Sequence, residues 1–413
     1  MAIRIRLIIM NFLEFFVWGS WLTSLSSYLI ESLHYSGQQV GSIYATMGIA
    51  SLVTPAVFGI IADRWMPAQR LLGLSHIAGA LLLLYASMVH DFYALYLIIL
   101  ANSLIFMPTI ALNNTVSYII LERKGLQIVR DFPPIRVWGT IGFIAAMWLV
   151  DLLGLTKSPS QLYVSATAGI LLGIYTFSLE NCPPGGKEKS RSLYSALGLD
   201  AFVLFSKRTL LVFFLFAMLL GAALQITNTF GLPFLNDFKT YYAESFAVKH
   251  PNILISISQI SETLFILTIP FFLKRFGIKK VMLMSIFAWV FRFGLFGLGN
   301  PGIGLWLLIL SMIIYGMAFD FFNISGSLFV EKEADVHIRA SAQGLFMFMT
   351  NGLGAFFGGM LSGWVVDHFT VSGVKQWREI WFTFAAYAIF LGLIFPFLFR
   401  YRHNKQEMEV LHP

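Results

Sequence analysis

The sequence predicts an all-α polytopic membrane protein with twelve transmembrane helices in two six-helix bundles. Its 413 residues are 57% hydrophobic and only 12% charged, whereas a soluble domain averages about 25% charged residues. Apolar segments recur along the chain at close to the length of about 20 residues that a helix needs to cross the hydrocarbon core. A polar stretch rich in proline and glycine divides these segments into two sets of six.

Each half of the chain supplies six predicted spans. The first half gives 5–30, 37–62, 70–89, 92–119, 134–152 and 161–179, and the second gives 209–232, 250–273, 281–299, 304–329, 341–366 and 379–399. The predicted domains are an N-terminal six-helix bundle at 1–180, a cytoplasmic linker at 181–208, and a C-terminal six-helix bundle at 209–413 with a short cytoplasmic tail. The linker opens with Asn181-Cys182-Pro183-Pro184-Gly185-Gly186, and residues 193–205 suit an amphipathic surface helix.

Lysine and arginine residues predict the orientation in the membrane. With both termini cytoplasmic, the inside loops and tails hold 21 of these residues and the outside loops hold five, as the positive-inside rule requires. The net charge of +7 is therefore a topology signal, and we expect no nucleic-acid partner. Cys182 is the single cysteine, which excludes an intrachain disulfide and a cysteine-type metal site. We expect no bound metal and no cofactor.

The two halves repeat each other's loop signals. Gly59-Ile-Ile-Ala-Asp63-Arg64 follows the second span, and the basic run Lys274-Arg275-Phe276-Gly277-Ile278-Lys279-Lys280 follows the eighth. Mixed acidic and basic residues follow both the fourth and the tenth spans. A six-plus-six repeat around a long central loop is typical of the major facilitator fold.

Five charged residues interrupt the apolar segments: Glu14, Arg136, Glu262, Arg292 and Asp320. A charge at the bilayer centre costs about 2.5–3.5 kcal/mol on insertion scales, so such residues are rare and mostly functional. They indicate a transport protein and mark its substrate path. Two roles stay open at this point: Asp320 is either a coupling acid or the partner of Arg292 or Arg136 in an ion pair, and Glu14 is either a second proton site or a structural partner.

Helical spacing gathers candidate binding residues on two faces. Arg136, Thr140 and Phe143 share one face of the fifth span, where Arg136 either faces the cavity or snorkels to the inner interface. Gln225 and Asn228 share a face of the seventh span. Side-chain amides offer paired donors and acceptors, which suit a nucleobase or a hydroxylated ligand better than a cation. The bland alternative is hydrogen bonding between helices.

The eighth and tenth spans add an acid and aromatic rings. Gln259 and Glu262 repeat the spacing of three residues, and Glu262 lies near the centre of its span. A carboxyl group there is protonated part of the time, as a proton-coupling site needs, unless it stays neutral and bonded to a neighbour. Tyr315, Phe319 and the interleaved Asp320, with Asn323, favour a mixed aromatic and polar pocket.

Other patterns have structural readings or exclude functions. Gly354, Gly358, Gly359 and Gly363 form overlapping Gly-x-x-x-Gly patterns in the eleventh span, which are typical of close helix packing. The sequence has no nucleophile elbow, phosphate-binding loop or His-Glu-x-x-His motif. We therefore expect no enzymatic activity, and no transport powered by ATP within this chain.

Long segments of the chain resemble the bacterial nucleoside:proton symporter family of the major facilitator superfamily. They are Asp131-Phe-Pro-Pro-Ile-Arg136-Val-Trp-Gly-Thr140, Leu224-Gln225-Ile-Thr-Asn228, Ser256-Ile-Ser-Gln259-Ile-Ser-Glu262, Ala318-Phe-Asp320-Phe-Phe-Asn323-Ile-Ser-Gly, Trp18-Gly-Ser-Trp21 and Arg339-Ala-Ser-Ala-Gln343-Gly. The resemblance implies uptake of nucleosides with proton symport across the bacterial inner membrane. It also implies a nucleoside site lined by Arg136, Thr140, Phe143, Gln225, Asn228, Gln259, Glu262, Tyr315 and Phe319, with Glu262 and Asp320 as the proton-linked acids.

The resulting hypothesis is alternating access around a central cavity. Phe143 or Phe319 stacks on the base, amides bond the base edge or the ribose hydroxyls, and protonation of Glu262 or Asp320 biases the motion. We expect purine and pyrimidine nucleosides as substrates, the lipid bilayer as the surroundings, and a monomer. The alternatives are a narrower xanthosine-type permease, a sugar or drug transporter of the same fold, or a membrane sensor, although the tail after Arg400 is too short for a signalling domain.

Overall fold

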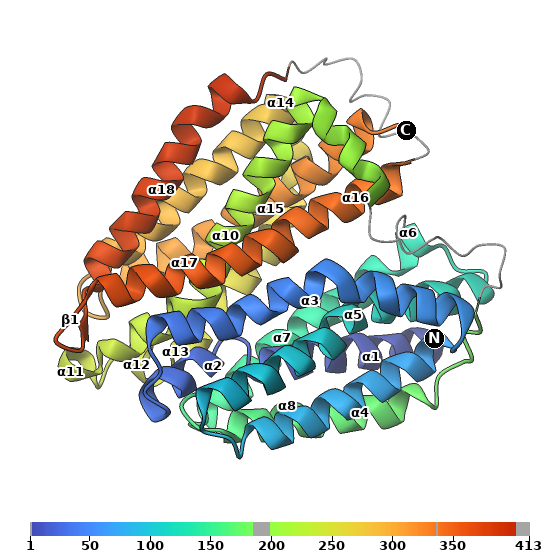
Figure 1. The fold of residues 1–413 in the computed structure, drawn as a ribbon, viewed down its shortest axis with the longest axis horizontal. Helices are drawn as coiled ribbons and strands as arrows, with labels where there is room; N and C mark the ends of the chain where they lie inside the picture. Colours follow the sequence, from blue (N-terminus) through green and yellow to red (C-terminus); the bar gives the residue numbers. More distant parts are fainter. Residues whose placement is uncertain (1, 185–198, 336–337, 402–413) are drawn as a thin grey trace. The chain divides into compact units, whose positions relative to one another are not determined.

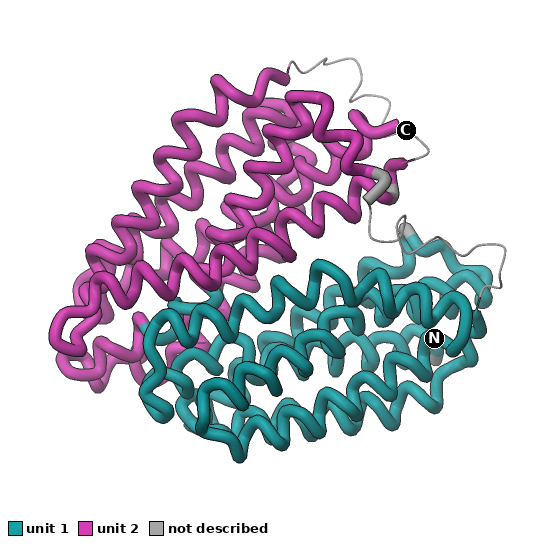
Figure 2. The backbone as a smooth tube through the Cα atoms, in the orientation of Figure 1, with its two compact units in different colours: residues 1–197, 228–233 teal, residues 198–227, 234–413 magenta. Residues whose placement is uncertain are grey.

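A computed structural model describes residues 2–184, 199–335 and 338–401. The chain forms two compact units (Figure 2). Unit 1 comprises Met1–Leu197 and Asn228–Pro233, and unit 2 comprises Gly198–Thr227 and Phe234–Pro413. Long helices build both units (Figure 1).

Unit 1 contains six long helices joined by short turns. They are α1 (Ala2–Gly19), α3 (Gly37–Arg64), α4 (Ala68–Ala86), α5 (Phe92–Arg123), α7 (Pro133–Leu152) and α8 (Ser160–Thr176), with the short elements α2 (Leu25–Ser27), η1 (Tyr28–Ser32) and α6 (Ile128–Asp131) between them. Local signals start these helices: Ser36 and Gln39 form a capping box before α3, and the Asp91 carboxylate caps α5. Helix α1 packs on α7, α3 on α5, and α4 on both α5 and α8.

The expected first span, 5–30, is interrupted in the structure. Helix α1 ends at Gly19, and turns at residues 20–24 precede α2 and η1. The Tyr44 hydroxyl donates to the Leu22 carbonyl oxygen and accepts from the Ser26 N–H, while the Ser24 hydroxyl donates to Gln161. These side chains bond backbone groups that a continuous helix would otherwise satisfy by itself, so the helix can end here.

Unit 2 contains the remaining long helices, except that residues 228–233 of α10 are assigned to unit 1. They are α10 (Arg208–Asp237), α14 (Ile257–Leu298), α15 (Leu305–Glu333), α17 (Ala355–His368) and α18 (Trp377–Leu398), with α11 (Lys239–Tyr242), α12 (Phe246–Lys249), α13 (Pro251–Ile255), α16 (Arg339–Met347), the 3-10 helix η3 (Leu199–Ser206) and the π-helix η5 (Phe348–Gly354). A short antiparallel pair, β1 (Thr370–Val371) and β2 (Val374–Lys375), sets Thr370 opposite Lys375.

The loop expected between spans 250–273 and 281–299 is absent from the described structure. Residues Ile257–Leu298 of α14 comprise two helices that meet at Gly277, whose φ of 74° and ψ of 165° lie outside the helical region. Glycine alone adopts this conformation without steric cost. One residue therefore replaces the connection that the basic run at 274–280 had suggested.

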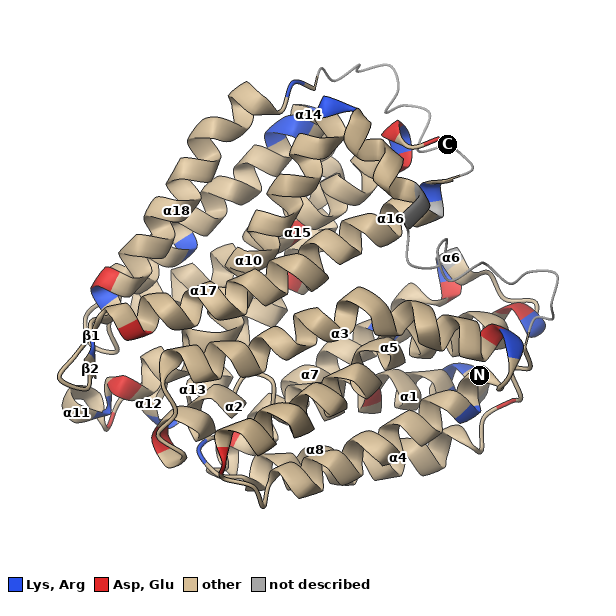
Figure 3. Ribbon diagram, in the orientation of Figure 1, with Lys and Arg blue, Asp and Glu red and all other residues tan. Residues whose placement is uncertain are grey.

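Nine helices of the described residues are long and apolar enough to cross a bilayer. Helix α8, with 17 residues, and α1, with Arg4, Arg6 and Glu14, are not among these nine, and α14 counts once despite its break. A helical membrane fold is therefore confirmed, while the number twelve stays a prediction. Charged residues gather mainly near helix ends and loops, and few lie along the helices (Figure 3).

Parts of two predicted segments lie outside the described residues: 185–198 of the linker, and 402–413 of the cytoplasmic tail. Of the surface helix expected at 193–205, only the last part is described. Residues 199–206 form a 3-10 helix in which Ala201 and Leu204 are buried and Val203 is exposed.

Candidate functional site

In unit 1, the candidate residues of α7 lie close to α1. The guanidinium carbon of Arg136 lies 3.9 Å from the centre of the Phe15 ring. A side chain on Gly142 would collide with the Phe12 carbonyl oxygen, so the two helices touch backbone to backbone. Arg136 and Thr140 are partly buried, and Phe143 is buried. The cationic Arg136 side chain thus stacks on an aromatic ring of α1, and a cation–π contact of this kind stabilises the charge.

Aromatic rings extend this contact across unit 1. The Trp18 ring lies 6.4 Å from Phe15, 6.0 Å from Phe143 and 5.9 Å from Phe106 between ring centres. Phe106 in turn meets the imidazole of His76 edge to face at 6.1 Å. Phe143, expected to stack on a base, therefore already has an aromatic neighbour within unit 1.

Glu14, whose role the sequence left open, has two polar partners. Its Oε2 lies 2.7 Å from His76 Nε2, and its Oε1 accepts a hydrogen bond of 2.7 Å from the Thr109 hydroxyl. Glu14 is fully buried, and His76 is 3% exposed. These three side chains come from α1, α4 and α5. Sequence reasoning missed His76 and Thr109 because they lie 62 and 95 positions from Glu14, beyond any local spacing signal.

The candidate residue Gln225 of α10 lies in unit 2 beside closely packed glycines, whereas Asn228 of the same helix is assigned to unit 1. Gln225 is buried, and Asn228 is partly buried one turn further along. A side chain on Gly358 would come within 2.6 Å of the Ala222 carbonyl oxygen, and one on Gly354 within 2.6 Å of the Met218 carbonyl oxygen. The predicted close packing is confirmed for these two glycines.

The residues of α14 and α15 form one connected group. The Ser261 hydroxyl donates to the Ile313 carbonyl oxygen, which joins the two helices next to Glu262. Glu262 is partly buried, and its charge interacts with both Tyr315 and Asp320. The Tyr315 ring lies nearly parallel to that of Phe319 at 6.3 Å. The structure therefore brings together four of the predicted residues of these two helices, and Gln259 lies partly buried one turn before Glu262.

A small pocket opens beside this group within unit 2. Trp289, Phe319 and Phe322 contribute aromatic rings to its lining, and Asn323 and Asn351 contribute side-chain amides. This combination offers stacking surfaces next to paired hydrogen-bond donors and acceptors. Asn351 belongs to the π-helix η5, a type of irregularity that is frequent at functional sites, and it was not predicted.

Arg292 and Asp320 do not pair, which corrects one of the expected alternatives. Ser311 donates to the Arg292 carbonyl oxygen and Ser285 to that of Ala318, so α15 residue 311 lies opposite 292. Asp320 is nine residues further along α15, about 13 Å at a rise of 1.5 Å per residue. The Arg292 guanidinium instead lies 4.3 Å from the centre of the Phe296 ring and 5.2 Å from that of Tyr315.

Both charged groups keep polar atoms without hydrogen-bond partners among the described residues. These atoms are Nε and Nη1 of Arg292 and Oδ2 of Asp320, and both side chains are 3% exposed. Buried polar atoms of this kind cost stability and call for a functional account. Arg136, the other suggested partner of Asp320, belongs to unit 1, and that pairing stays a prediction. Within the described residues, no cluster of histidine, cysteine or acidic side chains could hold a metal ion.

Comparison with known proteins places these residues in context. A sequence model described as "Nucleoside H+ symporter" matches residues 1–404. The chain is 55% identical to the xanthosine permease of Escherichia coli (strain K12), covering 99% of each chain. It is 50% identical to the nucleoside permease NupG of the same organism, covering 98% of this chain and 97% of NupG.

Solved structures agree with the sequence comparisons. A crystal structure of NupG matches with a TM-score of 0.92 at 50% identity, covering 97% of this chain and 100% of the NupG chain. A bacterial homologue of the lysosomal transporter Spinster, crystallised in an inward-facing conformation, matches with a TM-score of 0.70 at 15% identity and 96% coverage of both chains. That second likeness shows the fold alone.

Proposed function

Because this chain belongs to the nucleoside H+ symporter family, we propose that it takes up purine and pyrimidine nucleosides together with protons across the bacterial inner membrane. The observation that carries the proposal is the family match over residues 1–404. The two full-length permease relatives support it.

We assign nucleoside binding to the residues on the described faces. The Phe319 ring at the pocket of unit 2 supplies a stacking surface, and stacking on aromatic rings is worth about 1–3 kcal/mol per base in other nucleic-acid sites. Gln225, Asn228 and Gln259 supply amides for the base edge and ribose hydroxyls. Thr140, Phe143 and Arg136 of α7, with Tyr315, complete the assignment.

We assign proton coupling to Glu262 and Asp320. Their charges interact, so protonation of one carboxyl group changes the energy of ionising the other. Asp320 also keeps a buried oxygen without a hydrogen-bond partner among the described residues, which a proton would turn into a donor. No further cofactor is needed for this chemistry.

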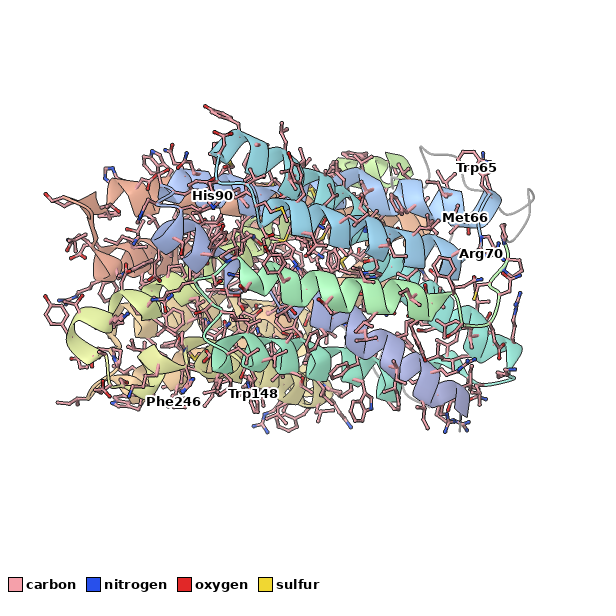
Figure 4. The ribbon with its side chains drawn as sticks, turned by 90° about the horizontal axis from the view of Figure 1, so that it is seen from below. Trp65, Met66, Arg70, His90, Trp148 and Phe246 are labelled. Carbon is pink, nitrogen blue, oxygen red and sulfur yellow. The ribbon has the colours of Figure 1, made fainter. Side chains whose placement is uncertain are left out.

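The arrangement in the membrane is part of the proposal. Counting α1, α8 and the two parts of α14 separately, the nine candidate spans become twelve helices in two six-helix bundles. In unit 1, ion pairs of Arg4 with Asp131 and of Lys124 with Glu180 join segments at one end. Trp65, Met66 and Arg70 lie at that end and His90 at the other (Figure 4). Most of the basic residues of unit 1 are at the first end, which supports cytoplasmic termini. We propose a monomer.

A narrower xanthosine-type permease is the second candidate, and the higher identity to the xanthosine permease favours it. Both candidates are tested with the purified chain in proteoliposomes. Uptake of labelled uridine, adenosine and xanthosine is measured under an inward proton gradient, with and without a protonophore. Broad specificity predicts uptake of all three, and the narrow candidate predicts uptake of xanthosine alone. Uptake that is unchanged by the protonophore would exclude proton symport.

A further inference from the structure

A buried acid, an imidazole and a hydroxyl group meet in unit 1, away from the residues assigned above. Glu14 is fully buried and bonds His76 Nε2 through one oxygen and the Thr109 hydroxyl through the other. Because α1, α4 and α5 each supply one member, the cluster depends on the packing of three helices. A charged carboxylate so far from water is costly unless it is paired and hydrogen-bonded.

Counting hydrogens shows that this cluster accommodates an additional proton. The Thr109 hydroxyl has one hydrogen but two acceptors within reach, Glu14 Oε1 at 2.7 Å and the Phe106 carbonyl oxygen at 2.6 Å. It donates to only one of them at a time. When it donates to Phe106, the contact with Oε1 is a hydrogen bond only if Glu14 carries the proton. The same heavy-atom positions therefore suit both the carboxylate and the carboxylic acid.

We propose that Glu14, His76 and Thr109 form a second proton-binding site, a role that rests on the proposed symport. A proton supplied by hydronium from the solvent adds to Glu14 Oε1, and the new O–H donates to Thr109 Oγ1. The Thr109 hydrogen then rotates to the Phe106 carbonyl oxygen, and His76 Nε2–H continues to donate to Oε2. Release reverses these steps, and no electron changes hands.

Aromatic contacts connect this site to the candidate substrate residues of the same unit. Phe106 supplies the carbonyl oxygen that accepts from Thr109 and also meets the His76 ring at 6.1 Å. Its own ring lies 5.9 Å from that of Trp18, which meets Phe143 at 6.0 Å. A change in the hydrogen bonding of Glu14 is thus two ring contacts from a residue assigned to nucleoside binding.

Other charged groups on the surrounding helices do not replace these partners. Within the described residues, no other charged side chain forms an ion pair with Glu14 or His76. The helices that carry the pair, or pack on those helices, hold Arg4 and Arg6 on α1, Asp63 and Arg64 on α3, Arg70 on α4, Glu122 and Arg123 on α5, and Arg136 and Asp151 on α7. Helix α8 contributes the tyrosines Tyr163 and Tyr175.

The first test changes the hydroxyl group alone. Thr109→Val removes a charge-assisted donor to the carboxylate, which costs more than the neutral bond that the acid form loses. The curve of nucleoside uptake against pH should therefore differ from that of the wild type, because the two protonation states of the cluster lose unequal hydrogen bonds. Thr109→Ser restores the wild-type curve. Thr115→Val is the matched control, because the Thr115 hydroxyl bonds only the Ala111 carbonyl oxygen on the same helix.

The second test removes the acid. In proteoliposomes, Glu14→Gln should lower proton-driven accumulation at least tenfold while nucleoside counterflow, which needs no net proton movement, falls far less. A wild-type pH curve in both Thr109→Val and Glu14→Gln would overturn the inference. Equal loss of accumulation and counterflow, with an unshifted curve for Thr109→Val, would show a purely structural cluster. Absence of counterflow in the wild type would instead reject the proposed function.

Discussion

The Ser311 hydroxyl donates a hydrogen bond of 2.8 Å to the backbone carbonyl oxygen of Arg292. This contact fixes the register between α15 and the second part of α14, and it leaves Asp320 about 13 Å along the helix from the position opposite Arg292. The two buried charges therefore form no direct ion pair within unit 2.

The lack of a direct contact between Arg292 and Asp320 predicts that their substitutions have nearly additive effects on stability. The stability losses of Arg292→Gln and Asp320→Asn should sum in the double variant to within about 0.5 kcal/mol, as for residues without contact. Glu14→Gln and His76→Gln provide the comparison pair, since those side chains are 2.7 Å apart, and their effects should be non-additive. Unfolding free energies in mixed micelles measure both cycles. A strong coupling between Arg292 and Asp320 would contradict the register.

Glu262→Gln should abolish pH-driven accumulation of nucleosides. The substitution keeps the side chain's size but removes the ionisable group whose charge interacts with Asp320. Counterflow of labelled nucleoside measures whether binding survives. Glu244→Gln is the control, because Glu244 is an exposed acid paired with Lys249. Full accumulation by the Glu262 variant would remove this residue from the coupling role.

Phe319→Leu should weaken nucleoside binding about 5- to 150-fold, the equivalent of 1–3 kcal/mol of lost stacking. Phe319 lines the pocket of unit 2, whereas Phe291 on α14 is 58% exposed on the helix surface. Phe291→Leu should therefore bind normally. Half-saturation concentrations for counterflow measure the effect of both substitutions, and equal values would show that Phe319 does not stack on the base.

Cys182 should resist alkylation in the folded protein. Burial raises the pKa of its thiol to about 11, and Glu180 adds to the effect while Arg123 opposes it. The thiolate fraction at pH 8 is then about 100-fold smaller than for an ordinary cysteine. Labelling with a maleimide before and after denaturation measures the protection. Rapid labelling of the native protein would show that the segment after α8 opens.

The ionised Asp131 side chain should make the free energy of unfolding decrease as the pH becomes acidic. Its removal from water opposes ionisation, but the Gln127 N–H and the guanidinium groups of Arg130 and Arg4 prevail and lower its pKa. A lowered pKa gives stability that is present above the unfolded-state value and is lost as pH falls through the folded-state value. Asp131→Asn should therefore melt below the wild type at pH 7, and the difference should vanish in acid. A pH-independent difference would refute this origin.

The sequence predicted those features that depend on the length of the apolar segments and on the spacing of residues along each helix. The faces carrying Gln225, Glu262 and Phe319 follow from helical periodicity, and the family follows from long shared segments. Periodicity within one helix cannot reveal the partner on another, so it missed His76 and Thr109 and allowed the wrong pair of Arg292 with Asp320. The break after Gly19 depends on Tyr44, a contact between segments that no local propensity contains.

The single-residue break at Gly277 has a consequence for how the protein is made. With α14 continuous on both sides, almost no chain separates its two halves, and Lys274, Arg275, Lys279 and Lys280 surround the bend. During synthesis on the ribosome, the chain therefore has no long loop between these two halves that could be placed on one or the other side of the membrane. The two halves should therefore enter the bilayer together, with their basic bend held on one side of the membrane during synthesis.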